Sequence, residues 1–272
     1  TSGHVTLVQG DSTMLKFAAS EVRGNLNATT GSGSAVQQTG ILTVDGTTFI
    51  STKDAGSDGT HDSNVKINSY ENVLTGAVSL EGWNVRLVNS KAVEVGTLKS
   101  RALILTARGA ITQSLARVIT SEGVSTITAQ SSDTNTDYNV TLENVNDFQG
   151  NIELTAANVS IENTDSTLLG ESTLSGNYTM VTTGGVVDNG DLDIEGYTSI
   201  TTATDENITL DRATNDFTGA VSVVGNNVEL TDANAIVLGT SDVSGTYEVV
   251  ATAGGNITDS GSEVLDITGN AT

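Results

Sequence analysis

The chain of 272 residues contains no cysteine and no proline, and only 4% of its residues are aromatic. Without cysteine, neither a disulfide framework nor thiol chemistry is available, which excludes the small secreted folds that depend on such bonds. The single tryptophan, Trp83, and the scarcity of other rings disfavour a sandwich with a large aromatic core. We therefore expect a thin core of valine, leucine and isoleucine.

Basic residues are also scarce, since 11 Lys and Arg stand against 33 Asp and Glu, for a net charge of −22. Residues 1–117 hold ten basic and nine acidic residues, which gives +1 (10 − 9). Residues 118–272 hold Arg212 and 24 acids, which gives −23 (1 − 24). Such a surface repels nucleic acid and anionic membranes. The acids indicate either a solvated β surface or binding of a divalent cation.

No apolar run approaches the length of about 18 residues that a membrane-spanning helix needs, so we expect no spanning segment. Helical periodicity is missing too. Apolar and polar residues instead alternate, as in Val228-Glu229-Leu230-Thr231, and this period of two predicts strands. The short runs end at Gly, Asn, Asp or Ser, residues that are typical of turns.

One segment recurs along the chain. It reads NDFTGAVSVVGNNVELTDANAIVLG at residues 215–239, NDFQGNIELTAANVSIENTDSTLLG at 146–170 and NVLTGAVSLEGWNVRLVNSKAVEVG at 72–96. A degenerate copy is predicted near the beginning, where HVTLV at residues 4–8 matches NVELT. An internal repeat of this kind is typical of stacked or circular repeat architectures.

The equivalent valines Val5, Val85, Val159 and Val228 are 80, 74 and 69 residues apart (85 − 5, 159 − 85, 228 − 159). We predict a single repeat domain over residues 1–272. Its copies are expected at about 1–71, 72–145, 146–214 and 215–272. Because the fourth copy is shorter than the others, we expect the natural polypeptide or its assembly to continue beyond it.

A repeat of this length is too long for a propeller blade and divides into about three coils of roughly 23–26 residues. The sequence therefore predicts an all-β fold, a parallel β-helix whose coils stack on one another. Val85, Val159 and Val228 are expected to lie above one another as an aliphatic ladder. A second ladder beside it is expected from the residues two positions later, Leu87, Ile161 and Leu230.

Asparagines precede these valines at Asn84, Asn158 and Asn227. Stacked amides along a solenoid bond to the backbone at corners or to one another. We interpret these residues as a structural ladder, with a binding site as the alternative.

The densest acidic cluster comprises Asp188, Asp191, Asp193 and Glu195, which we regard as candidate calcium ligands because calcium binds six to eight oxygens. The alternation with Leu192 predicts that Asp191, Asp193 and Glu195 point outward. No basic residue or histidine is near them in sequence, which disfavours a catalytic site. The Gly-Gly-x-Gly-x-Asp pattern of calcium-bound β-rolls is absent. We predict no catalytic residues and no cofactor besides this candidate calcium.

The segments TGAVSL at 75–80, GAITQS at 109–114 and TGAVSVVGNNVELTDANAIVLG at 218–239 resemble the repeats of filamentous-haemagglutinin-like adhesins and related β-strand-repeat proteins of bacterial surfaces. This resemblance covers most of the chain and implies a right-handed β-helical shaft that is secreted to the cell surface. The Asn-Pro-Asn type motif of that family's secretion cap is absent, because the chain has no proline.

Our leading hypothesis is a non-enzymatic, extracellular protein that forms the stiff shaft of a bacterial surface adhesin. Its partners would be a glycan or protein of a host cell, a neighbouring cell or the matrix. The alternative is a self-assembling subunit of a filament or surface layer, head-to-tail or lateral, with calcium as a candidate aid. A β-helical polysaccharide-degrading enzyme and an ice-binding protein, the latter suggested by the threonine runs 198–202 and 126–128, are further alternatives.

Overall fold

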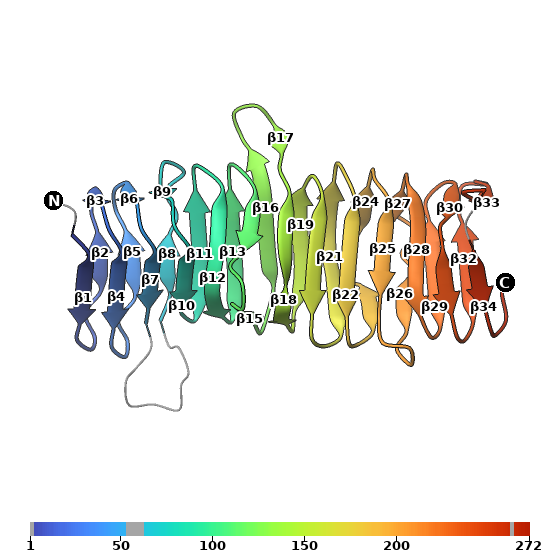
Figure 1. The fold of residues 1–272 in the computed structure, drawn as a ribbon, viewed down its shortest axis with the longest axis horizontal. Helices are drawn as coiled ribbons and strands as arrows, with labels where there is room; N and C mark the ends of the chain where they lie inside the picture. Colours follow the sequence, from blue (N-terminus) through green and yellow to red (C-terminus); the bar gives the residue numbers. More distant parts are fainter. Residues whose placement is uncertain (1–2, 53–62, 262–263) are drawn as a thin grey trace. The chain divides into compact units, whose positions relative to one another are not determined.

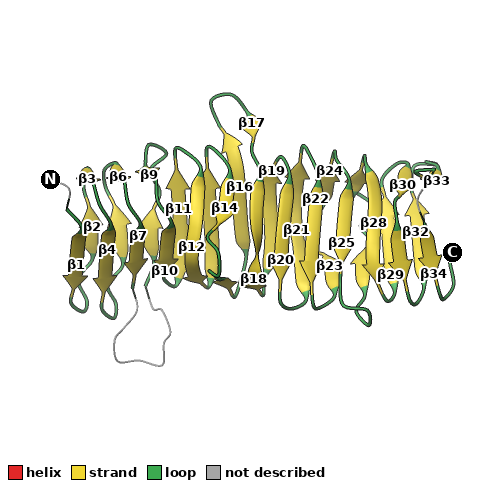
Figure 2. Ribbon diagram, in the orientation of Figure 1, coloured by secondary structure: helices red, strands yellow, loops and turns green. Residues whose placement is uncertain are grey.

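The computed structural model describes residues 3–52, 63–261 and 264–272, which form 34 strands and no helix (Figure 1, Figure 2). Among these residues there is accordingly no helix long and apolar enough to cross a membrane. The chain divides into two compact units, Thr1–Tyr138 and Asn139–Thr272. An Asp-, Gly- and Ser-rich insertion in the sequence, residues 53–62, lies outside the described residues.

The described part of the first unit contains seventeen strands. They are β1 Val5–Gln9, β2 Leu15–Phe17, β3 Ser20–Val22, β4 Leu26–Thr30, β5 Val36–Gln38, β6 Leu42–Val44, β7 Thr48–Ser51, β8 Val65–Ile67, β9 Val73–Leu74, β10 Val78–Glu81, β11 Asn84–Asn89, β12 Val93–Ser100, β13 Ala102–Ala107, β14 Ile111–Gln113, β15 Ile119–Ser121, β16 Ser125–Ser131 and β17 Thr136–Asp137.

The described part of the second unit also contains seventeen. They are β18 Val140–Phe148, β19 Asn151–Ala156, β20 Val159–Asn163, β21 Thr167–Leu174, β22 Tyr178–Thr182, β23 Val186–Asp188, β24 Leu192–Ile194, β25 Thr198–Thr201, β26 Ile208–Leu210, β27 Asp216–Phe217, β28 Ala220–Gly225, β29 Val228–Asp232, β30 Ile236–Leu238, β31 Ser241–Val243, β32 Tyr247–Ala251, β33 Ile257–Asp259 and β34 Leu265–Ile267.

Each unit is a parallel β-solenoid, as the sequence predicts. In the first unit the strand orders are β1-β4-β7-β10-β12-β14 and β2-β5-β8-β11-β13-β16; in the second they are β18-β20-β22-β25-β28-β30-β33 and β19-β21-β23-β26-β29-β32. The chain thus passes back and forth between these two sheets, and neighbours within a sheet come from successive coils. In the first unit β3, β6 and β9 form a third sheet of three strands. Among the described pairs, β16 with β17 is antiparallel and forms a small hairpin.

Most coils contain fewer residues than predicted. Residues paired in register through the first unit are Val65, Val85, Leu103 and Ser125, at spacings of 20, 18 and 22. In the second unit they are Val140, Val159, Tyr178, Thr198 and Val221, at spacings of 19, 19, 20 and 23. The expected 23–26 residues per coil was therefore too many, because many corners use only two or three residues between strands.

This shorter coil offsets consecutive repeats by half a turn. Val5 in β1 and Val85 in β11 lie in opposite sheets of the first unit, and Val159 in β20 and Val228 in β29 lie in opposite sheets of the second. Strands β23 and β24 lie in the same sheet and count as one visit to it, as do β26 and β27. Counted in this way, the chain crosses from one sheet to the other seven times between β20 and β29. A repeat of seven half-turns places equivalent residues on opposite sides.

The predicted ladder of Val85, Val159 and Val228 is consequently wrong, and so is the ladder of Leu87, Ile161 and Leu230, which belong to the same three strands. Val159 stacks between Val140 and Tyr178, whereas Val228 stacks between Ile208 and Tyr247. The inward residues still form aliphatic ladders, but each is built from neighbouring coils rather than from equivalent positions of the repeat. Burial of apolar area between neighbouring coils stabilises such a stack.

A β-bulge recurs in the repeat. In β12 the register with β10 shifts around Gly96, and in the fourth copy it shifts around Gly239, between β30 and β31. A Cβ at Gly96 would lie 2.2 Å from Ser79 Oγ, and a Cβ at Gly239 would lie 2.3 Å from Ser222 Oγ. Glycine is required at both places because a side chain of the preceding coil occupies the space of its missing Cβ.

Candidate functional site

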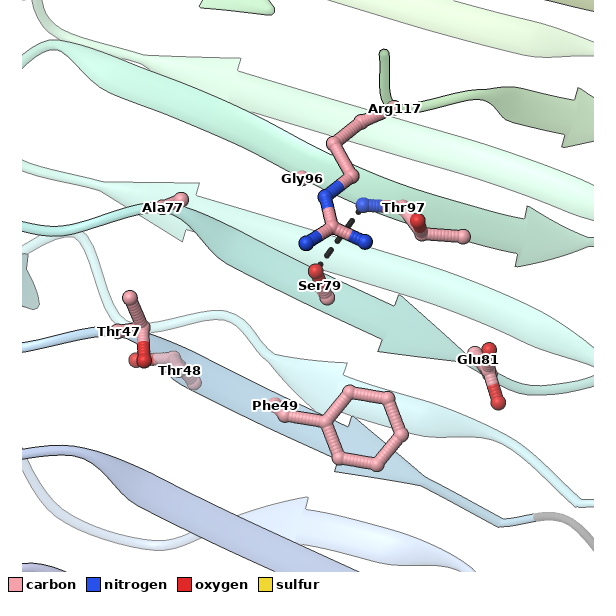
Figure 3. A pocket seen from close by; sticks show the side chains of 9 residues that line it. All are labelled: Thr47, Thr48, Phe49, Ala77, Ser79, Glu81, Gly96, Thr97 and Arg117. Carbon is pink, nitrogen blue, oxygen red and sulfur yellow. Dashed lines mark hydrogen bonds between the residues drawn. The ribbon is translucent and has the colours of Figure 1, made fainter. Parts of the chain in front are cut away.

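A groove on the outer surface of the first unit is lined by residues of four successive coils. It is a cavity of about 370 Å³, and Figure 3 shows the side chains around it. Its lining residues come from β7, β10, β12 and the connection between β14 and β15, and they are Thr47, Thr48, Phe49, Ala77, Ser79, Glu81, Gly96, Thr97 and Arg117.

The groove is hollow because its floor consists of small residues. Ala77, just before β10, and Ser79 on β10 lie beside the bulge residue Gly96 on β12. Phe49, paired in register with Ser79, forms one wall. The floor and this wall therefore follow directly from the in-register stacking of the coils.

The floor is held in place by the bulge. Ser79 Oγ accepts a hydrogen bond of 3.0 Å from the backbone N–H of Thr97, drawn as the dashed line in Figure 3. A bulge leaves one residue without its ladder partner, and here the serine hydroxyl satisfies that N–H group. This bond fixes the positions of Ser79 and Thr97 relative to each other.

Two charged side chains complete the groove. Glu81 ends β10, and its Oε2 accepts a hydrogen bond of 3.0 Å from Ser51 Oγ of the preceding coil. Arg117 lies in the β14–β15 connection, and its guanidinium extends toward Ser79 and Thr97 in Figure 3. The groove thus combines an aromatic ring, hydroxyl groups, one carboxylate and one guanidinium.

The fourth copy repeats the framework of this groove without its larger side chains. Ser222, Gly239 and Thr240 stand at the repeat positions of Ser79, Gly96 and Thr97. The positions of Phe49 and Glu81 are instead occupied by Ser199, which pairs with Ser222, and by Val224. The framework therefore belongs to the repeat, whereas the aromatic ring and the carboxylate are particular to the second-copy groove.

A second hollow of about 320 Å³ in the first unit is structural. Gln38 Oε1 accepts hydrogen bonds from Ser69 N (3.1 Å) and Asn72 Nδ2 (3.0 Å), and Asn72 Oδ1 accepts one from Leu42 N (3.0 Å). These amides join two neighbouring coils at a corner, which accounts for them as supports of the backbone.

The four predicted calcium ligands do not share one environment. Asp188 is buried at the end of β23, where its carboxylate accepts hydrogen bonds from Asn215 Nδ2 (2.6 Å) and from the backbone N–H groups of Asp211 and Arg212 (both 3.3 Å). Burial raises the pKa of Asp188, although these donors oppose the shift. Its oxygens face N–H donors, an arrangement that supports the next coil.

The other three candidates are exposed, as predicted, while Leu192 and Ile194 between them are buried. Asp191 accepts hydrogen bonds from Thr214 Oγ1 and Arg212 Nε, both at 2.7 Å, and these two bonds lower its pKa. No group of three or more His, Cys, Asp or Glu suited to a metal ion occurs among the residues that the structure describes.

Arg212 is the partner that sequence inspection missed. It lies 21 residues after Asp191, which is about one coil. Residues one coil apart are neighbours in a solenoid, so a search of the nearby sequence does not find them.

The predicted asparagine ladder is confirmed as a structural feature. The backbone N–H and the Nδ2 of Asn84 both donate to Asn64 Oδ1, at 3.2 and 2.9 Å. Asn158 makes the same pair of bonds to Asn139, at 3.2 and 3.0 Å. Asn227 makes it to Asn207, at 3.1 and 3.0 Å. In every case the partner is an asparagine of the preceding coil.

Comparison with known families decides the classification. A model described as repeats of unknown function (DUF5649) matches residues 2–81, 82–155, 156–224 and 225–272. The chain belongs to this family. Its matches begin 80, 74 and 69 residues apart (82 − 2, 156 − 82, 225 − 156), the same spacings as those of the repeated valines. No curated protein and no solved structure matches the chain.

Residues of the groove are separated by 30 and 17 positions, from Phe49 to Ser79 and from Ser79 to Gly96, and no sequence motif joins them. The sequence signal that could have revealed the groove is a difference between copies at equivalent positions. Phe49 and Glu81 are large or charged where the corresponding coils of the later copies have Ser199 and Val224.

Proposed function

We propose that this chain is a non-enzymatic, extracellular structural and adhesive protein that forms the stiff shaft of a bacterial surface adhesin. The observation that supports this function is the contrast within the repeat. One framework of strand, bulge and glycine occurs in the second and fourth copies, while Phe49 and Glu81 occur at one groove. A scaffold that displays a local contact site has this organisation.

The coil contacts support the structural part of this function. Successive coils are joined by backbone hydrogen bonds in two sheets and by asparagine side chains at the corners. Each coil is therefore held by the next at several points of its circumference, which resists bending within a unit.

The composition of the groove supports binding rather than catalysis. Glu81 is the one carboxylate among the nine described residues that line the groove. Hydrolysis of a glycosidic bond ordinarily requires two carboxyl groups on either side of that bond. We therefore propose adhesion to a glycan or protein of a host cell, a neighbouring cell or the matrix.

A binding screen tests this function. The full chain is attached to beads and offered an array of glycans and matrix proteins, with the double variant Phe49→Ala/Glu81→Gln as the comparison. We expect retention on at least one array component and unchanged components after incubation. Absence of retention on every component, or cleavage of a glycan, would contradict the proposal.

Electron microscopy with and without calcium tests the alternative of a self-assembling subunit. Dispersed particles under both conditions agree with a shaft that needs no self-association. Ordered filaments or lattices would favour the self-assembling subunit, and their appearance only with calcium would indicate a cation-bridged contact between acidic surfaces.

A further inference from the structure

We infer that the groove between Phe49, Glu81 and Arg117 binds one neutral hexose unit of a glycan. This inference rests on the proposed adhesive function and assigns its ligand class and its site. It follows from the size of the groove, the aromatic wall, the polar groups and their balance of charge.

The size of the groove suits a single sugar ring. Its volume of about 370 Å³ is near the lower end of the range of roughly 300–1,000 Å³ that is usual for small-molecule sites. The floor of Ala77, Ser79 and Gly96 gives depth on an otherwise corrugated strand surface. A longer saccharide would leave its remaining units in solvent.

Phe49 provides an apolar surface of the kind that a pyranose ring stacks on. The residue is half-buried on the outer side of β7. Its neighbours in register are Asn27 and Ser79, so neither adjacent coil places an apolar side chain beside the ring. The C–H face of a hexose stacked on this ring would remove apolar area from water.

The polar groups of the groove match hydroxyl groups, which both donate and accept hydrogen bonds. The Glu81 carboxylate accepts one bond from Ser51 and has acceptor capacity for further bonds. The Arg117 guanidinium is a donor, and the Thr97 hydroxyl is both donor and acceptor. Sugar hydroxyls beside the ring of Phe49 would meet groups of both kinds.

The charges favour a neutral sugar. Glu81 and Arg117 give the groove one negative and one positive group, which cancel. A charged sugar would be attracted by one of these groups and repelled by the other, so its charge brings no net gain, whereas neutral hydroxyl groups can bond to both.

The fold itself does not require these side chains. The bulge at Gly239 forms with Ser199 and Val224 in place of Phe49 and Glu81. These two positions are therefore a matched control inside the same molecule.

The first experiment measures binding of neutral hexose oligosaccharides to the full chain by saturation-transfer NMR and calorimetry, with acidic and amino sugars as comparison ligands. We expect neutral sugars to bind, and Phe49→Ala and Glu81→Gln each to weaken binding by about fivefold or more. Ser199→Ala, at the matched position, should leave the affinity unchanged.

The second experiment separates binding from stability by using two matched glycines. Gly96→Ala and Gly239→Ala place a Cβ 2.2 and 2.3 Å from a serine Oγ, so both should lower the unfolding midpoint by similar amounts. Only Gly96→Ala should weaken sugar binding, because Ser79 forms the floor of the groove.

Three results would overturn the inference. Sugar binding that survives both Phe49→Ala and Glu81→Gln would place the ligand elsewhere and leave the adhesive function standing. Binding of acidic or amino sugars or of protein, without neutral hexoses, would refute the ligand class alone. Absence of any retained ligand would refute this inference together with the adhesive function.

Discussion

Replacement of Asn163 by aspartate tests how the buried amides hold neighbouring coils together. Asn163 ends β20 and is 1% exposed. Its Oδ1 accepts a bond of 2.8 Å from the N–H of Phe148. Its Nδ2 donates to the carbonyl oxygens of Phe148 and Asp165, both at 3.2 Å, and to Thr167 Oγ1 at 3.0 Å. Aspartate keeps the shape and the acceptor but removes these donors.

The loss is substantial because the aspartate would face carbonyl oxygens in a dry site. Each lost hydrogen bond costs about 0.5–1.5 kcal/mol, and an unsatisfied buried group adds about 1–3 kcal/mol. The threonine hydroxyl can turn to donate to the carboxylate, which offsets one loss. We therefore expect Asn163→Asp to lower the free energy of unfolding by about 3 kcal/mol at neutral pH.

Asn158→Asp is the matched control, since it introduces the same charge five residues earlier at an exposed position. It loses one side-chain bond, to Asn139 Oδ1, and should cost less than about 1 kcal/mol. Urea unfolding followed by far-UV circular dichroism measures both. Equal midpoints for the two variants would refute the role given to the buried amide.

The cost of Asn163→Asp should also depend on pH. Burial would raise the pKa of the new carboxyl in the folded chain above its unfolded value, so the folded state would bind the proton more tightly. The destabilisation is then largest above that raised pKa and shrinks as pH falls through it. A cost that grows on acidification would contradict the argument.

Three further predictions concern a buried tyrosine, two glycines and a buried aspartate. Tyr178→Phe removes a buried hydroxyl with no hydrogen-bond partner among the residues that the structure describes, so thermal unfolding should show unchanged stability or a gain of up to about 1 kcal/mol. A marked loss would contradict this. Gly196→Ala places a Cβ 2.4 Å from the backbone carbon of Gly176 and should lower the free energy of unfolding, measured in urea, by about 1–3 kcal/mol. Gly10→Ala is its control: the added Cβ meets no described atom within 4 Å, so the free energy of unfolding should not change. Burial raises the folded-state pKa of Asp232, so the contribution of this residue to stability decreases as pH rises through that pKa. Asp232→Asn should therefore flatten the pH dependence of the urea midpoint. An unchanged pH dependence would refute this.

The parallel coil stack could be predicted from the sequence because its causes are local. Alternation such as Val228-Glu229-Leu230-Thr231 specifies strands, and short polar runs specify corners. The half-turn offset of the repeat could not be predicted in this way. It depends on the length of each corner. If each coil is a few residues shorter, a repeat of the same length makes three and a half turns instead of three.

The groove and the ion pair were beyond sequence reasoning for a related reason. Contacts in a solenoid join residues about one coil apart, and that separation varies from 17 to 30 positions along this chain. Arg212 therefore reaches Asp191, and Phe49 lines the same groove as Ser79, without a fixed spacing. Departures of one copy from the repeat are the signal that remains readable.

Cysteine cross-linking tests the central claim, that coils stack in register with consecutive repeats on opposite sheets. The chain has no native cysteine, so each pair can be introduced alone. Ser160 pairs in register with Thr179, at the inter-strand distance of about 4.8 Å that suits a disulfide. Glu229 holds the position of Ser160 in the next repeat but lies in the other sheet. We predict rapid oxidation of Ser160→Cys/Thr179→Cys and none within one molecule for Ser160→Cys/Glu229→Cys; the reverse result would contradict the account.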